Sequence, residues 1–366
     1  MAKEFDFNQG IPGKYSALKV LHHPEKMQAL REGVISAPVY LRFNPTNRCD
    51  EECFYCVYIS NFSGIHPTMN YRDELPREKV LETLDDFKDM GVKAVTWSGG
   101  GESLLPKYAP EMLKRTVENG IGLSAITNGL RLSGERAEIL ANAGDWVRIS
   151  IDYCDENMFK KIRKRGKVAF DQTVQNMSYF AKIKNPKCDF EANCVIHEHN
   201  YDKLFDIAKF LKETGVENVR FSPVWFKGFE EYHAPFKQRA IEEIAKAKEK
   251  LEDGTFEVGS TYEKYFINNS SSSQRLPRCL WGEIVSVIGA DGNVNICHNK
   301  SYDPSGVIGS INDQSFKQMW FSEQTRNFFR NFDPRKLCNH ECSAHERNLL
   351  LEEFLASSDP KLNIYP

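Results

Sequence analysis

The chain has 366 residues, of which 41% are hydrophobic and 27% are charged, and its formal net charge is −3. This composition excludes global disorder, and the near-neutral charge gives no electrostatic reason to bind nucleic acid or an anionic membrane. The sequence has no apolar signal core and no run of about 18 apolar residues, so we expect a cytoplasmic protein. In a reducing compartment, the ten cysteines indicate metal binding or catalysis rather than disulfides.

Short apolar runs alternate with helical patterns from Val39 to Pro223. Six runs predict strands, at residues 39–43, 92–97, 121–126, 146–151, 190–196 and 219–222. The helical patterns between them lie at residues 76–90, 106–119, 133–143, 155–164, 169–183 and 201–214. This alternation predicts a parallel sheet with right-handed crossovers. Six units are too few for a closed eight-unit barrel, so we expect an α/β fold with a partial (β/α)6 barrel, whose functional loops follow the strands.

The pattern changes after this region. Residues 237–252 predict a charged surface helix, and the polar stretch 268–274 predicts a linker. A hairpin is expected after Cys279, around the turn at 290–292, and a helix at 315–330. We therefore expect five segments: an N-terminal extension (1–37), the partial barrel (38–228), a helical connector and linker (229–275), a small cluster-binding hairpin-plus-helix module (276–350) and a tail (351–366).

Three cysteines form a C-x3-C-x2-C motif in the loop after the first predicted strand: Cys49, Cys53 and Cys56. Three thiolates leave one iron of a four-iron cluster open to an outside ligand. A zinc ion would need a fourth protein ligand, for which His66 is the nearest candidate. Tyr55, just before the last cysteine, offers a ring on which an adenine could stack.

This motif and the β/α layout from Tyr40 to Pro223 resemble the radical S-adenosylmethionine (SAM) superfamily. The resemblance implies a [4Fe-4S] cluster held by these cysteines, with SAM bound to the fourth iron through its amino and carboxylate groups. It also implies reductive cleavage of SAM to methionine and a 5′-deoxyadenosyl radical, which abstracts a substrate hydrogen atom. The implied electron donor is a reduced flavodoxin or ferredoxin.

Gly100, Gly101 and Glu102 follow the second predicted strand and match the GGE element of the family, which receives the SAM amino group. Glycines let a backbone approach a ligand closely, and a carboxylate accepts hydrogen bonds from an ammonium group. A triple glycine alone is more often a simple turn. Its position after a strand is what supports the functional interpretation.

Two further strand ends carry candidate SAM contacts. Asn128 ends the third strand, and Ser150 and Asp152 end the fourth, where the family commonly places ribose or carboxylate contacts. A capping or turn role is the alternative for each of these residues. Arg163 and Arg165 follow; one of them could pair with the SAM carboxylate, but a basic run is more typical of a solvated surface, which is our prediction for both.

A second set of four cysteines lies in the last quarter of the chain: Cys279, Cys297, Cys338 and Cys342. Spacing alone favours zinc, but after a radical SAM core the arrangement resembles the auxiliary-cluster modules called SPASM and twitch. A full SPASM region carries seven cysteines and two clusters, so four cysteines match the twitch form with a second, auxiliary [4Fe-4S] cluster. His298, His340 and His345 lie nearby, and we expect surface or supporting roles for them.

Three cysteines remain. Cys188 and Cys194 are expected to be small buried side chains. Cys154 follows the fourth strand at the predicted catalytic face, where a thiol could donate a hydrogen atom to a substrate radical, although a structural role is the commoner one. Glu191 and His197 share one face of the fifth predicted strand and are candidates for a substrate base or hydrogen-bond partner.

We therefore predict a radical SAM enzyme that oxidises or epimerises a small-molecule substrate such as a sugar or nucleoside. The alternative is a peptide-modifying maturase of ribosomally made peptides. It is disfavoured because the residues before the first strand are too few for a peptide-recognition domain, and because two auxiliary clusters would be more typical. A further alternative is a non-catalytic metal-binding module, which the SAM-contact motifs oppose.

Overall fold

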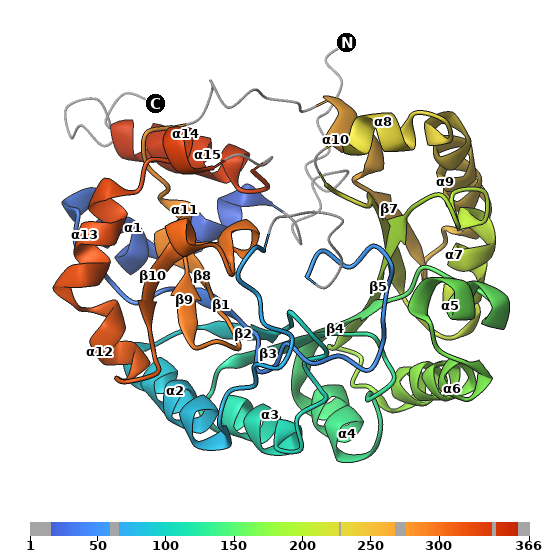
Figure 1. Cartoon of the computed structure of the whole chain (residues 1–366), viewed down its shortest axis with the longest axis horizontal. Helices are drawn as coiled ribbons and strands as arrows, with labels where there is room; N and C mark the ends of the chain where they lie inside the picture. The colour runs from blue at the N-terminus through green and yellow to red at the C-terminus, as the bar shows by residue number, and fades with distance from the viewer. Residues whose placement is uncertain (1–15, 59–65, 227, 268–275, 339–341, 358–366) are drawn as a thin grey trace, which may run out of the picture.

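A single sheet connects most of the chain in the computed structural model, which describes residues 16–58, 66–226, 228–267, 276–338 and 342–357 (Figure 1). Within these residues eight strands run parallel, and two antiparallel strands extend one edge. In sheet order the strands are β10 (Val307–Ser310), β9 (Asn293–Asn295), β8 (Val285–Ile288), β1 (Tyr40–Phe43), β2 (Ala94–Trp97), β3 (Gly122–Thr127), β4 (Gly144–Ser150), β5 (Asp189–Ile196), β6 (Asn218–Pro223) and β7 (Glu257–Ser260).

The predicted fold class is confirmed, and β1 to β6 lie where the sequence pattern placed them. Two features of the sheet differ from the prediction: the strand β7 and the pairing of β8 with β1. β7 lies inside the segment expected to be a helical connector, and it pairs in parallel with β6. β8 belongs to the expected hairpin with β9, but it also pairs in parallel with β1, so that Tyr40 is opposite Val285. The hairpin therefore extends the barrel sheet. The predicted linker at 268–274 lies outside the described residues.

Helices cover the outer side of the curved sheet (Figure 1). Those of the barrel are α2 (Arg77–Met90), α3 (Ala109–Glu118), α4 (Gly134–Ala143), α5 (Glu156–Arg163), α6 (Lys167–Ile183), α7 (Leu204–Glu213), α8 (Phe229–His233), α9 (Lys237–Leu251) and α10 (Tyr262–Ile267). The C-terminal part adds α11 (Trp281–Ile284), α12 (Phe316–Trp320), α13 (Glu323–Asn331), α14 (Pro334–Leu337) and α15 (His345–Ala356). The single helix predicted at 315–330 is wrong, because Ser322 starts a new helix by accepting a hydrogen bond from the backbone N–H of Thr325.

The two faces of the sheet differ in chemistry. On the outer face, the Phe43 ring stacks on Trp97 with centroids 4.9 Å apart, and it contacts Phe87 of α2. On the inner face, the hydroxyl of Tyr40 donates to Thr96 Oγ1 at 2.6 Å, and Thr96 Oγ1 lies 2.6 Å from Ser124 Oγ. Alternation along each strand thus places apolar side chains under the helices and leaves a polar interior.

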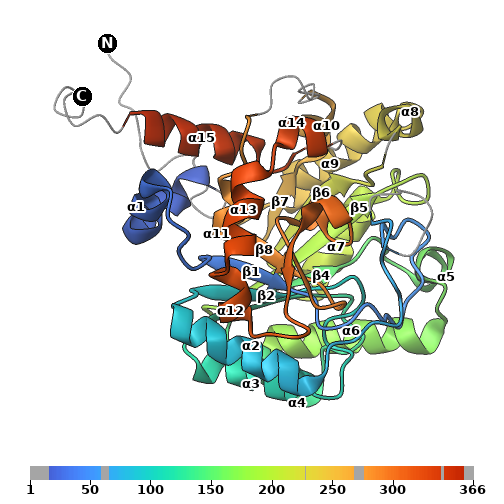
Figure 2. The ribbon, with the colours of Figure 1, turned by 60° about the vertical axis from the view of Figure 1, so that its left-hand side comes forward.

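A second, smaller core joins the two ends of the described chain. Helix α1 (Pro24–Glu32) contributes Met27 and Leu30, which pack with Leu280, Ile284 of α11 and Leu351 of α15. Figure 2 shows α1 and α15 side by side at the edge of the molecule. Within the described ranges, none of the helices combines the length and apolar character that a membrane crossing requires.

Candidate active site and cluster centres

The loop after β1 carries Cys49, Cys53 and Cys56 as half-buried free thiols. Its conformation is fixed by Tyr71, whose hydroxyl donates to the carbonyl of Cys49 at 2.7 Å and accepts from the Cys49 N–H at 3.3 Å. The Cys56 N–H also donates to the carbonyl of Cys53. Burial raises the pKa of Cys53 to about 12, and the charge of Arg163 opposes this shift.

Arg163 is buried beneath this loop, and the prediction of a surface arginine is wrong for this residue. Its guanidinium donates to Asp152 Oδ1 at 2.7 and 3.0 Å, to Glu51 Oε2 at 3.0 Å and to the sulfur of Cys53 at 3.0 Å. It also donates to the carbonyl of Ser150 at 2.8 Å. Burial alone would raise the pKa of Asp152, but the Arg163 charge together with His197 and Tyr55 outweighs it and holds that pKa at about 2.

The local sequence contains a signal for the burial of Arg163. Phe159 lies four residues earlier, on the same side of α5, and it is fully buried. By contrast Arg165, beyond the end of α5, is exposed as predicted. The basic run thus contains one buried arginine among solvent-exposed basic residues. The buried one is the residue that shares a helix face with Phe159.

Gly100 and Gly101 are required by packing against the cysteine loop. A Cβ at Gly101 would lie 2.0 Å from the carbonyl oxygen of Arg48, and one at Gly100 would lie 2.3 Å from Asn47 Oδ1. The backbones are also joined, because the Gly101 N–H donates to the carbonyl of Thr46 and the Glu102 N–H donates to that of Arg48. The close approach expected of these glycines is thus made to the chain's own backbone.

Glu102 is buried at the end of this glycine loop. Its Oε1 accepts from the Leu104 N–H at 3.0 Å and from the Thr127 hydroxyl at 2.8 Å, and its Oε2 accepts from the Asn128 N–H at 2.7 Å. Burial raises the pKa of Glu102 to about 7 in spite of these bonds. The carboxyl group is therefore partly protonated near neutral pH.

Asn128 connects the end of β3 to the cysteine loop. Its Nδ2 donates to Asp50 Oδ1 at 2.8 Å and lies 3.9 Å from the sulfur of Cys49. The other oxygen of Asp50 pairs with Arg131 at 2.8 Å. The structure thus brings Glu102, Asn128 and the first cysteine together, as expected for parts of one site.

Tyr55 lies in an aromatic group with His197 and Phe54. The Tyr55 and His197 ring centroids are 5.2 Å apart, and those of Phe54 and His197 are 5.0 Å apart. His197 Nδ1 accepts from the N–H of His199, which assigns the proton to Nε2. That Nε2 faces Asp152 Oδ2 at 3.4 Å. His197 and Asp152 therefore form a buried polar pair beside Tyr55.

The other two predicted catalytic residues have different surroundings. Glu191 is buried on the inner face and forms an ion pair with Arg148, with Oε2 and Nη2 2.7 Å apart. Cys154 contacts the Met158 sulfur of α5 at 3.7 Å, and burial raises the pKa of its thiol to about 11. The thiol is half-buried and packs against the main hydrophobic core.

The expectation for the remaining cysteines is confirmed, because Cys188 and Cys194 are fully buried. Cys188 lies just before β5, where its sulfur contacts the carbonyl of Leu140 at 3.6 Å. Cys194 lies within β5 and is contacted by Asn200 Nδ2 at 3.9 Å. Both contacts are those of packed interior side chains.

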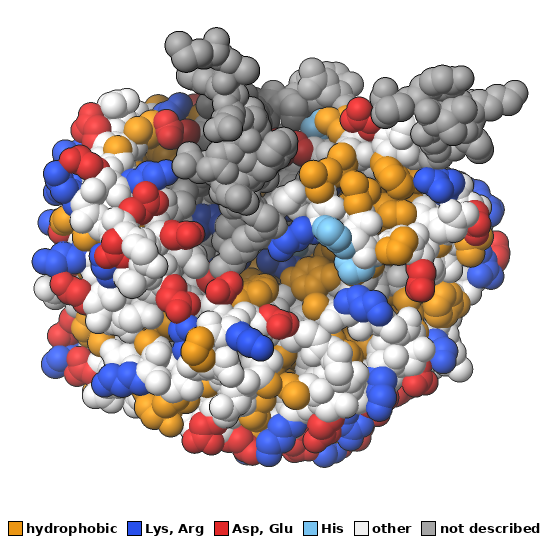
Figure 3. Space-filling model, turned by 180° about the vertical axis from the view of Figure 1, so that it is seen from behind, with side chains coloured by type: hydrophobic (Ala, Val, Ile, Leu, Met, Phe, Trp, Pro, Cys, Tyr) orange, Lys and Arg blue, Asp and Glu red, His pale blue; other side chains and the backbone are white. Residues whose placement is uncertain are grey.

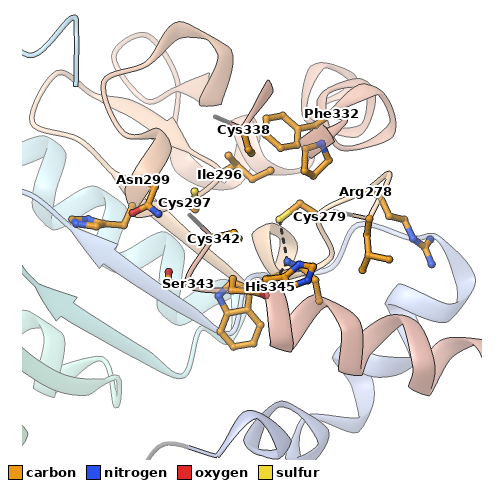
Figure 4. A pocket seen from close by; sticks show the side chains of 16 residues that line it. Arg278, Cys279, Ile296, Cys297, Asn299, Phe332, Cys338, Cys342, Ser343 and His345 are labelled. Carbon is orange, nitrogen blue, oxygen red and sulfur yellow. Dashed lines mark hydrogen bonds between the residues drawn. The ribbon is translucent and has the colours of Figure 1, made fainter. Parts of the chain in front are cut away.

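The second cysteine set lines one pocket between the hairpin and α15 (Figure 4). All four members contribute: Cys279, Cys297, Cys338 and Cys342. Asn348 Nδ2 lies 3.8 Å from the sulfur of Cys279, and burial together with the neighbouring thiols raises the pKa of Cys279 to about 12. His298 and His345 also line this pocket, whereas His340 lies outside the described residues.

Aromatic contacts connect the two cysteine sets. Tyr58, just after Cys56, lies with its hydroxyl 3.2 Å from His298 Nδ1, and its ring stacks on His66 with centroids 4.5 Å apart. His66 Nδ1 is bonded to the carbonyl of Ser301 at 2.6 Å. His66 therefore serves as a structural contact between the loops, which weakens its case as a zinc ligand.

Thiol spacing also bears on the choice of metal. Zinc–sulfur bonds of about 2.3 Å place tetrahedral thiolates within about 4 Å of one another, whereas thiolates on the corners of a four-iron cluster lie farther apart. Among the described residues no group of three or more His, Cys, Asp or Glu side chains is arranged around a single ion position. Three thiols in one loop and four thiols lining one pocket match, in number, the ligands of an open and of a fully ligated four-iron cluster.

Comparisons with known proteins agree with this geometry. Residues 43–211 match the model of the "Radical SAM superfamily", and residues 279–343 match SPASM, an "Iron-sulfur cluster-binding domain". A relative from Ruegeria pomeroyi, named PqqA peptide cyclase, is 23% identical over 306 residues, which cover 82% of this chain and 79% of the relative.

Two solved structures have a similar fold. Streptococcus suis SuiB bound to precursor peptide SuiA is 16% identical, with a TM-score of 0.61 over 90% of this chain and 75% of that one. The enzyme anSMEcpe with bound AdoMet and a Kp18Cys peptide is 18% identical, with a TM-score of 0.57 over 89% and 98% of the two chains. From the motifs, the geometry and these matches together, we conclude that the chain belongs to the radical SAM superfamily and has a C-terminal SPASM iron–sulfur cluster-binding domain.

Proposed function

We propose that this radical SAM enzyme modifies a peptide. The observation that carries the proposal is the placement of two cysteine sets around a polar inner face on one continuous sheet, a fold that this chain shares with SuiB and anSMEcpe. Both of these were solved with peptides bound, and the Ruegeria relative is named a peptide cyclase. Peptide modification, which the sequence left as the alternative, therefore replaces the oxidation or epimerisation of a small molecule that the sequence favoured.

In this proposal the first cysteine loop holds the [4Fe-4S] cluster that cleaves SAM when reduced. Glu102 accepts from the SAM amino group, and Asn128 holds the loop against it. Arg163 orients the loop through Glu51 and keeps Asp152 ionised beside Tyr55, on whose ring an adenine would stack. A buried, preformed set of partners of this kind orients a ligand without the cost of ordering side chains on binding.

The second cysteine set holds one auxiliary [4Fe-4S] cluster in our proposal. Four thiols complete one cluster, and the chain has too few cysteines near residues 279–343 for a second. Such a cluster can accept the electron left behind when a substrate radical is oxidised. In this proposal the pocket between the hairpin and α15 is the site that receives this electron.

Charge on the inner side supports a peptide substrate. Arg220 lies on β6, in register with Asn193 of β5, and its charge lowers the pKa of Arg347 at the start of α15 after the larger effect of burial. The two arginines are thus within electrostatic range of each other. A peptide with acidic side chains or a free carboxylate would be attracted there.

The test is an anaerobic incubation of the reconstituted full chain with SAM, dithionite and separate pools of synthetic peptides, sugars and nucleosides. We expect the peptide pools to stimulate 5′-deoxyadenosine formation and a matching mass change in a peptide. A product two mass units lighter would indicate dehydrogenation, and solvent deuterium incorporated without net oxidation would indicate epimerisation. The matched control replaces all three cysteines of the first loop with alanine. Stimulation by sugars or nucleosides alone would overturn the proposal.

A further inference from the structure

An exposed basic segment, residues 160–167, lies directly beside the first cysteine loop. Five of its side chains are positively charged and exposed: Lys160, Lys161, Lys164, Arg165 and Lys167. Figures 1 and 2 both show α5 next to the segment that follows β1. The face seen in Figure 3 differs, because there positive and negative side chains are intermixed.

The charges of this segment are only partly compensated. Lys167 pairs with Asp171 at 3.0 Å and approaches Glu156 at 4.0 Å. For the other four basic residues, the described part of the chain contains no ion pair within 4 Å. A net positive surface of this kind raises the local concentration of an acidic partner and speeds its encounter.

Helix chemistry explains only part of this pattern. Lysines in the last turn of a helix favourably oppose its dipole, which accounts for Lys160 and Lys161. Lys164 is different, because it follows the helix in the left-handed conformation, with φ of 56°, where glycine is the usual residue. The basic run then continues beyond the helix with Arg165. Neither the helix dipole nor the usual preference for glycine at this position accounts for a lysine here.

The segment is mechanically joined to the cysteine loop. The Glu52 N–H donates to the carbonyl of Arg163 at 3.1 Å, and the Phe54 N–H donates to that of Ile162 at 3.3 Å. The Arg163 side chain in turn donates to the sulfur of Cys53. A protein docked on the basic segment would thus be separated from the first cluster by about one layer of residues.

An aromatic path lies at the same place. Lys161 is close enough to His199 for its charge to lower the pKa of that imidazole, after the larger effect of burial. The centroid of the His199 ring lies 5.0 Å from that of Phe54, which is the residue between Cys53 and Tyr55 in the sequence. The positive surface and the cysteine loop are therefore continuous.

We propose that the basic segment 160–167 is the docking surface for an acidic one-electron carrier protein of the flavodoxin or ferredoxin type. One electron leaves the reduced carrier and enters the cluster of the first cysteine loop, and no covalent bond forms or breaks in that transfer. The proposal rests on the proposed function, because only an enzyme that cleaves SAM reductively needs this electron. An acidic peptide substrate is the competing occupant, and the test separates the two.

The test compares two charge-reversed forms of the reconstituted full chain. The first carries Lys160→Glu, Lys161→Glu and Arg165→Glu. The matched control carries Lys88→Glu, Lys187→Glu and Lys248→Glu, three exposed residues that precede β2, β5 and β7 and so lie toward the other end of the sheet. Both forms change the net charge equally. The readouts are the rate of cluster reduction by photoreduced flavodoxin, followed by absorbance and electron paramagnetic resonance, and the binding of oxidised flavodoxin.

We expect the first form to lose about tenfold or more in flavodoxin-driven reduction at low salt, and the wild-type rate to fall as salt is raised. The control form should stay within about twofold of wild type, and dithionite should reduce the cluster equally in all forms. A glutamine version of the first form guards against misfolding and should show a smaller loss of the same sign.

Equal rates for the two charge-reversed forms would overturn the proposal. It would also be overturned if the first form raised the KM for an acidic peptide while flavodoxin-driven reduction stayed unchanged. If reduction by flavodoxin follows the expected pattern but no peptide is modified, the docking surface stands and only the proposed substrate fails. If dithionite reduces no cluster in wild type, both proposals fail.

Discussion

The hydroxyl of Tyr302 donates a hydrogen bond to Oδ1 of Asn47, although 255 residues separate them in sequence. Asn47 precedes the first cysteine, and its Nδ2 donates to the carbonyl of Asn70 at 2.9 Å. Tyr302 follows the hairpin cysteine, and its hydroxyl accepts from the N–H of Ala290 at 3.2 Å. One buried phenol therefore holds the loop of the SAM cluster against the auxiliary domain.

Replacing Tyr302 with phenylalanine should destabilise the fold by about 1–3 kcal/mol, because Asn47 Oδ1 and the Ala290 N–H lose a buried partner. The measurement is denaturant unfolding followed by circular dichroism. Tyr179→Phe is the matched control, since the Tyr179 side chain is 44% exposed. A Tyr302→Phe effect no larger than that of the control would contradict this reading of the contact.

Gly101→Ala should prevent the first cluster from assembling, because the new Cβ would lie 2.0 Å from the carbonyl oxygen of Arg48. We expect the iron content of the reconstituted chain to fall from about eight to about four atoms, with the auxiliary cluster retained. Gly254→Ala is the control, because nothing lies within 4 Å of its Cβ position. Unchanged iron in Gly101→Ala would show that the two loops can separate without loss of the site.

Arg163→Met should destabilise the protein by about 3–5 kcal/mol at pH 7, since it leaves the Glu51 and Asp152 carboxyl groups buried without their cation. The neighbouring Arg165→Met should have almost no effect. In wild type the pKa of Asp152 is lowered to about 2, whereas its value in the unfolded chain is about 3.9. The ionised carboxylate therefore stabilises the fold fully at pH values above about 3.9, and this stabilisation is lost as the pH falls through about 2.

In the Arg163→Met variant, ionisation of Asp152 has the opposite effect on stability. Burial without the cation raises the folded pKa of Asp152, so its ionisation opposes folding and the variant loses stability as the pH rises. The gap between wild type and variant should therefore be smaller at pH 5 than at pH 8, as measured by denaturant unfolding at both values. A gap that does not depend on pH would refute the role assigned to this ion pair.

SAM should bind more weakly as the pH falls below 7. Burial raises the pKa of Glu102 to about 7, and the protonated carboxyl group cannot accept from the SAM amino group as a carboxylate does. We expect up to about a tenfold rise in Kd per pH unit below that value, measured by equilibrium binding to the reconstituted enzyme. Glu102→Gln should bind SAM weakly at every pH in this range. A flat wild-type profile would exclude Glu102 as the acceptor.

Cys154→Ala should leave turnover within about twofold of wild type, because the thiol contacts the Met158 sulfur and packs against the hydrophobic core. The measurement is the rate of peptide modification together with the deuterium content of product formed in deuterated water. Cys188→Ala provides a fully buried thiol for comparison. Selective loss of deuterium incorporation in Cys154→Ala alone would instead support the hydrogen-donor role suggested by the sequence.

Much of the structure could be predicted from patterns within short segments of the sequence. The six barrel strands and the spacing of the cysteines are properties of short segments, and they located the sheet and both cysteine sets. The pairing of β8 with β1 was missed because it joins distant segments, and neither strand's pattern specifies its neighbour. β7 was missed because its four residues, with a glycine and an exposed glutamate, have no strong strand pattern.

Among the site residues, too, those marked by a local pattern were predicted and those defined by long-range contacts were not. Asn128 was found because it directly follows a strand, and Glu102 because it ends the GGE element in the loop after a strand. Loops after parallel strands converge at one edge of the sheet. Arg163 was misplaced, and Asn47 and Tyr302 were not noticed, since their importance comes from contacts between loops that are remote in sequence. Burial of a charged residue is decided by what packs over it, which no local pattern records.

The pairing of β8 with β1 has a consequence for any attempt to shorten the protein. A chain that stopped at residue 275 would turn β1 from an interior strand into an unprotected edge, with the free backbone groups of Tyr40 to Phe43 able to recruit another copy. Such a truncation would yield an aggregating fragment instead of a minimal SAM-cleaving enzyme. The C-terminal domain is therefore a structural part of the barrel as well as the holder of the second cysteine set.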